Sequence, residues 1–144
     1  MTKDTPISVN RKTAYLMLRF MLGLSILMHG LVRLPHLHAF ADGMVRQFQE
    51  TLLPAALVRA FAIGLTFVEA GVGLLLVPGL LTRWALLLGS LTMSCLIFGT
   101  SLLSDWNVLA IQMLYAVIYA ALIATHQYNA YSVDALLERK ANLQ

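Results

Sequence analysis

Charged residues are scarce in this sequence of 144 residues. Aspartate, glutamate, lysine and arginine together make up 12%, whereas hydrophobic residues make up 59%, and the mean hydropathy is +0.75. So few charges cannot cover the surface of a soluble domain of this length. The composition therefore indicates a single-domain integral membrane protein whose principal partner is the lipid bilayer.

Cysteine occurs only once, as Cys95, inside an apolar run. A single cysteine excludes an internal disulfide and any cysteine-based metal cluster within one chain. We expect Cys95 to be a small packing residue. The net charge of +3 is modest, and basic residues in a membrane protein serve first to orient the spans, so we expect no nucleic-acid partner.

Four apolar runs are each long enough, at about 1.5 Å per helical residue, to cross a hydrocarbon core of about 30 Å. The first run is longer than a usual signal-peptide core, contains Arg19 and has no small-x-small cleavage site, so we interpret it as a retained span. The fold class is then all-α, an integral membrane four-helix bundle. The runs cover residues 14–34, 57–78, 84–103 and 108–125.

The stretch between Pro35 and Pro54 has a mixed composition in which apolar residues recur at every fourth position. This spacing predicts an amphipathic helix at the membrane interface between spans 1 and 2, with its apolar side on lipid or on the bundle. The recurring residues are Phe40, Met44, Phe48 and Leu52.

His36 and His38, in the same stretch, raise the question of a metal site. Two histidines two residues apart do not share a helical face, and they would need further ligands from Asp42 or His29. We therefore expect no metal and interpret both histidines as interfacial or packing residues.

The basic residues set the predicted topology. We expect a cytoplasmic N-terminal arm over residues 1–13, a membrane domain over 14–126, and a partly helical cytoplasmic tail over 127–144, in which Ser132 caps a short helix. The location would be the bacterial cytoplasmic (inner) membrane. Residues placed in the cytoplasm are Lys3, Arg11, Lys12, Arg83, Arg139 and Lys140; those placed outside are Arg33, Arg46 and Arg59.

The run from Phe61 to Pro78 carries one carboxylate, Glu69, near its middle. An ionisable group at that depth costs roughly 2.5–3.5 kcal/mol unless it is paired, protonated or hydrated. Glu69 therefore marks a candidate site and requires a partner from another span.

Arg19 in the first span is the predicted partner of Glu69. Counted from the cytoplasmic ends, the two residues and Tyr119 have similar depths, so we expect an Arg19–Glu69 ion pair with Tyr119 donating to the carboxylate. Thr66 and Tyr115 lie on the same helical faces and complete this inner polar site. Such a pair can also serve only to fix helix register, and that alternative stays open.

A second, outer polar site is predicted nearer the opposite surface. His29 and Gln112 have similar depths there, with Arg33 and Arg59 at the rim. Gly23 and Gly30 lie beside the polar face of span 1 and would allow another helix to approach closely.

Several short motifs occur together in this chain. Span 1 contains Leu18-Arg19-Phe20 and Met28-His29-Gly30-Leu31-Val32-Arg33, and the second span contains VEAGVGLLLVPGLLTR over residues 68–83. In this order the motifs resemble the DoxX family of small four-span membrane proteins, over about residues 15–125. The family usually carries lysine at the position of Arg33, a difference that keeps the charge.

The resemblance implies two classes of function. Some DoxX members are the small membrane subunit of a thiosulfate:quinone oxidoreductase, which implies a quinone at Arg19, Glu69 and Tyr119 and an anionic reductant facing Arg33, Arg59 and His29. Because the chain has no iron–sulfur or flavin motif, electrons would pass through a partner redox subunit or directly to quinone. The alternative is a non-enzymatic scaffold, chaperone or small-solute carrier, with a homo-oligomer needed for anything large. Whether the chain is an enzyme stays open.

Overall fold

The computed structural model describes residues 6–142, and its regular elements are all helical. This agrees with the predicted all-α class. The elements are α1 (Pro6–Arg33), η1 (Leu34–His36), α2 (Leu37–Gln47), α3 (Ala55–Leu76), α4 (Thr82–Leu102), α5 (Trp106–Ala124), η2 (His126–Tyr128) and α6 (Val133–Ala141).

Four helices, α1, α3, α4 and α5, are long and apolar enough to cross a membrane. Their outward faces are largely hydrophobic, as expected for lipid contact, with exposed residues such as Met21, Leu74, Leu91 and Leu114. The short helix α2 lies within the stretch for which an amphipathic helix is predicted. Its placement at a membrane interface stays a prediction.

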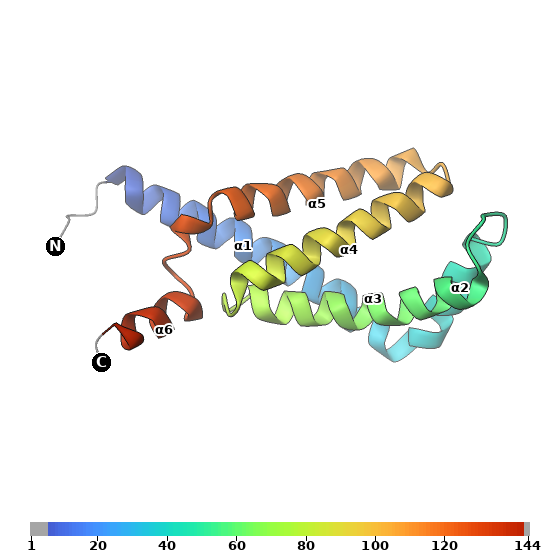
Figure 1. The fold of residues 1–144 in the computed structure, drawn as a ribbon, viewed down its shortest axis with the longest axis horizontal. Helices are drawn as coiled ribbons and strands as arrows, with labels where there is room; N and C mark the ends of the chain where they lie inside the picture. The colour runs from blue at the N-terminus through green and yellow to red at the C-terminus, as the bar shows by residue number, and fades with distance from the viewer. Residues whose placement is uncertain (1–5, 143–144) are drawn as a thin grey trace.

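The bundle has two distinct ends (Figure 1). The start of α1 and the helix α6 lie at one end, here called the termini end, together with the turn between α3 and α4. Helix α2 lies at the opposite end, here called the α2 end. Helices α3 and α4 meet at their short turn and diverge toward the α2 end (Figure 1).

Glycines bring α1 and α3 into close antiparallel contact, as the sequence predicts for Gly23 and Gly30. A Cβ on Gly30 would overlap the backbone of Ala70, and one on Gly73 would overlap the backbone of Leu27. A Cβ on Gly23 would lie 2.9 Å from the Cβ of Leu76. These contacts fix the register of the two helices.

Helix α1 begins earlier than the predicted span. It starts at Pro6, so residues 6–13, which were predicted to belong to an arm before the first span, instead continue the first helix. Nη1 of Arg11 donates to the hydroxyl of Tyr128 (2.7 Å), and this bond ties the helix extension to η2. The remainder of the predicted arm lies outside the described residues.

The predicted C-terminal cap is confirmed. The hydroxyl of Ser132 accepts from the backbone N–H of Ala135 (3.2 Å) and begins α6. A side-chain acceptor at this position satisfies one of the free N–H groups of the first helical turn. Helix α6 follows from it at the termini end (Figure 1).

Candidate functional site

The buried carboxylate of Glu69 pairs with Arg33. Nη1 of Arg33 donates to Oε2 of Glu69 across α1 and α3. The side chain of Glu69 is 6% exposed and that of Arg33 is 26% exposed. Arg33 therefore connects a buried acid to a more open part of the bundle.

The predicted Arg19–Glu69 ion pair is not formed, and helix direction explains why. Side chains on a helix lean toward its N-terminus. Because α1 and α3 are antiparallel, Arg19 and Glu69 lean away from each other, whereas Arg33 and Glu69 lean toward each other. The register in which Gly30 packs on Ala70 also places Glu69 near the C-terminal part of α1.

Arg19 instead binds backbone carbonyls at the termini end. Its Nη1 donates to Leu76 O (2.7 Å) and Val77 O (3.4 Å), and its Nη2 donates to Tyr131 O (2.8 Å). The last carbonyls of a helix have no intrahelical donor, and a basic side chain satisfies them. Leu76 lies seven residues, or about 10 Å along the helix, from Glu69. Arg19, which is only 1% exposed, is a structural residue.

The C-terminal segment closes the same end of the bundle. The carboxylate of Asp134 accepts from Leu81 N (2.7 Å) and Thr82 N (2.8 Å), and so caps the start of α4. Val133 N donates to Pro78 O at 3.1 Å. Arg19 and Asp134 thus hold the α3–α4 turn from two different parts of the chain.

Of the other residues of the predicted inner site, one lies near Glu69 and two are bonded elsewhere. Tyr119 lines a very small cavity together with Glu69 and packs against Gly89. The two residues are therefore near each other, but the predicted hydrogen bond from Tyr119 to the carboxylate is not formed. Thr66 is buried, but its hydroxyl donates to Ala62 O of its own helix (3.2 Å). Tyr115 lies with Ser25, since their hydroxyls are 2.7 Å apart.

The predicted outer site is also divided. Nδ1 of His29 lies 2.8 Å from Ser25 O of its own helix, and its ring makes an edge contact with Tyr115 at 6.3 Å between centroids. Arg59 pairs with Asp42 of α2, at 2.5 Å. Arg33 therefore pairs with Glu69 and His29 contacts Tyr115, whereas Gln112 lines a pocket that Arg33 also lines.

Two contacts hold α2 over the α2 end of the bundle. One is the Arg59–Asp42 pair between α3 and α2. In the other, the guanidinium carbon of Arg33 lies 4.5 Å from the ring centroid of Phe40, a cation–π arrangement. Arg33 thus contacts both the buried acid and α2.

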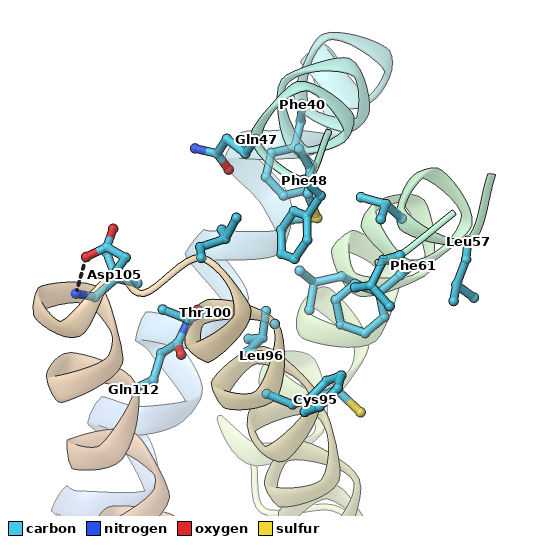
Figure 2. A pocket seen from close by; sticks show the side chains of 18 of the residues that line it. Phe40, Gln47, Phe48, Leu57, Phe61, Cys95, Leu96, Thr100, Asp105 and Gln112 are labelled. Atoms are coloured by element: carbon cyan, nitrogen blue, oxygen red, sulfur yellow. Dashed lines mark hydrogen bonds between the residues drawn. The ribbon is translucent and has the colours of Figure 1, made fainter. Parts of the chain in front are cut away.

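Beneath α2 lies a pocket of about 590 Å³. Figure 2 shows it between α2, α3, α4 and α5, with Phe40 and Phe48 on one side and Leu57 and Phe61 on another. Most lining side chains are apolar or aromatic. The polar lining residues are Arg33, Gln47, Ser94, Thr100, Asp105 and Gln112.

The amide of Gln112 projects from α5 toward Thr100 on α4 (Figure 2). Within residues 6–142, Oε1 of Gln112 is buried and has no hydrogen-bond partner. Buried polar atoms in proteins are nearly always bonded. This acceptor therefore distinguishes Gln112 from the other polar residues around the pocket.

Two arginines near the pocket are already paired with carboxylates. Arg33 faces Glu69, and Arg59 faces Asp42. An opposite charge in contact offsets most of the field that a second anion would otherwise experience. Both His36 and His38 are exposed, and no group of three metal-ligating side chains occurs among residues 6–142.

Comparison with known families agrees with the four apolar helices. The DoxX family model matches residues 14–102. The chain belongs to the DoxX family. No curated protein and no solved structure matches it. The DoxX match contains Arg19, Arg33 and Glu69 and ends before α5, so Gln112 and Tyr119 lie outside the matched residues.

Two features of this DoxX chain were missed at the sequence level. Asp134 caps a helix that begins 52 residues earlier, and no local pattern marks such a distant cap. The pocket had a partial signal, because the four-residue repeat that includes Phe40 and Phe48 predicts an apolar face on lipid or on the bundle. The structure turns that face partly toward the bundle.

Proposed function

We propose that this DoxX protein binds a quinone in the pocket beneath α2 and acts as the membrane subunit of a quinone-linked redox system. The observation that carries the proposal is the pocket itself, which combines apolar and aromatic walls with a few polar groups, and whose lining arginine, Arg33, is paired with Glu69. Its volume of about 590 Å³ lies within the range of small-molecule sites, roughly 300–1,000 Å³.

The position of the pocket supports a ligand that arrives from the bilayer. Leu57 of α3 and Phe98 of α4 line the pocket and are 56% and 61% exposed. In a spanning bundle these faces meet lipid, so an apolar molecule dissolved in the membrane could enter between the diverging helices. A quinone has both a lipid-soluble tail and a neutral polar ring.

The geometry favours a neutral head group over an anion. In the family-based hypothesis Arg33, Arg59 and His29 face an anionic reductant. Each arginine is instead paired with a carboxylate, and one ring nitrogen of His29 is engaged with its own helix. We therefore propose that a partner redox subunit, rather than this chain, binds the reductant and supplies the electrons.

The proposed orientation has both termini in the cytoplasm of a bacterial inner membrane. Arg11, Arg83, Arg139 and Lys140 lie at the termini end, and basic residues favour the cytoplasmic side. Helix α2 would then lie at the outer interface. Reporter fusions at the C-terminus and in the 48–54 loop test this proposal, and an exported C-terminus would overturn it.

The test of function is direct detection of the ligand. The protein is purified in mild detergent, and its extract is analysed for quinone by mass spectrometry. Leu57→Trp should fill the pocket mouth and lower the quinone content several-fold. Leu74→Trp, on a similarly exposed position of α3 away from the pocket, should leave it unchanged.

The absence of quinone would overturn the proposal. If the wild-type protein contains no quinone and does not bind added decylubiquinone, the redox proposal is wrong. A scaffold or carrier then becomes the better description. Equal quinone content in the Leu57 and Leu74 variants would place the ligand outside this pocket.

A further inference from the structure

Among residues 6–142, the pocket contains one buried side-chain acceptor with no hydrogen-bond donor. Oε1 of Gln112 is buried and unpartnered within residues 6–142, and Gln112 lines the pocket. An unpaired buried acceptor loses the hydrogen bond that it makes to water in the unfolded chain. A ligand that donates a hydrogen bond here would restore that interaction.

Three of the other polar residues around the pocket are committed elsewhere. The hydroxyl of Ser94 donates to Ser90 O (3.0 Å), and Nη1 of Arg33 donates to Glu69. Asp105 is an acceptor and already caps α5 through Val108 N at 3.1 Å. None of these bonds supplies a donor to Oε1 of Gln112.

We infer that the pocket prefers the reduced, hydroxyl-bearing form of the ligand, a quinol, through the amide of Gln112. This inference rests on the proposed quinone site. A quinol hydroxyl both donates and accepts, so it can bond to Oε1 as well as to Nε2 of the amide. A quinone carbonyl only accepts, so it can bond to Nε2 but leaves Oε1 unpartnered.

The amide can adapt to either contact at little cost. The terminal side-chain torsion of glutamine is broad, so the amide can turn its oxygen toward a ring hydroxyl. One additional hydrogen bond to a buried acceptor corresponds to roughly five- to tenfold in affinity. The expected preference for quinol over quinone is therefore about five- to tenfold.

Binding of decylubiquinol and decylubiquinone to the full chain in detergent tests the inference under anaerobic conditions. The wild-type protein should bind the quinol about five- to tenfold more tightly. Gln112→Met should weaken binding and bring the two affinities together. Gln49→Met, at an exposed position outside the pocket lining, should keep the wild-type ratio.

The ratio of affinities separates a specific contact from a general loss of structure, because a distorted pocket weakens both forms alike. Equal wild-type affinities would overturn the quinol preference and leave the quinone site intact. A preference that survives in Gln112→Met would remove Gln112 from the explanation. If neither form binds, the preference and the proposed function are both wrong.

Discussion

Arg33 and Glu69 form an ion pair between the end of α1 and the middle of α3, with the acid almost fully buried and the base at the pocket wall. The pair neutralises the only carboxylate in the second span. It also leaves the guanidinium in contact with Phe40 of α2. A single side chain therefore joins the membrane-embedded acid, the pocket and α2.

Loss of Arg33 alone should destabilise the protein strongly. Arg33→Met leaves Glu69 buried without a partner, and breaking a buried pair costs about 3–5 kcal/mol. The double variant Arg33→Met with Glu69→Leu should recover most of that stability, because no charge is left unpaired. Thermal unfolding in detergent measures both. A double variant no more stable than the single one would contradict the pairing.

Arg19 should behave independently of Glu69. Arg19→Met removes three hydrogen bonds to carbonyls, and bonds to charged groups contribute about 1.5–3 kcal/mol each. Because the two residues share no contact, the destabilisation by Arg19→Met and by Glu69→Leu should add within about 0.5 kcal/mol. Strong non-additivity in a double-mutant cycle would restore the Arg19–Glu69 pair.

The Asp134 cap predicts a measurable role for the C-terminal segment. Asp134→Ala removes the acceptor for Leu81 N and Thr82 N, and loss of a helix cap costs about 0.5–2 kcal/mol. Glu138→Ala, on the exposed side of α6, is the matched control and should change stability by less than about 0.5 kcal/mol. Equal effects of the two variants would show that the cap contributes nothing.

Four of the glycines in α1 and α3 divide into two predicted classes. Gly30→Ala and Gly73→Ala place a methyl group against the facing backbone, so each should destabilise the bundle by about 1–3 kcal/mol. Gly64→Ala and Gly71→Ala meet nothing within 4 Å and should be neutral or stabilising. Comparable unfolding temperatures for all four variants would refute the α1–α3 register.

The sequence predicts the helices better than their pairing. Each span follows from the length of an apolar run, and Ser132 as a cap follows from its position three residues before the bonded N–H group of Ala135. These features depend on neighbours in the chain. They can be read without knowing how the helices are arranged.

The partner of Glu69 depends on the register between two helices, which the sequence does not contain. The prediction placed Arg19 within reach of Glu69 because it assumed that all spans end at the same depth. It also ignored that side chains lean toward the N-terminus of their helix. Arg33, which lies one helical turn after Gly30, pairs with Glu69 instead. The glycine contacts supply that register, but only once it is known which backbone each glycine meets.

The acceptors of Arg19 are made at widely separated times during synthesis. The first span carries its guanidinium into the membrane before α3 exists to offer Leu76 O, and the carbonyl of Tyr131 comes 112 residues after Arg19. Until then the arginine needs water, lipid phosphate or the insertion machinery as a temporary partner. The hydrogen bonds of Arg19 in the first helix can therefore be completed only after the last segment of the chain has been synthesised.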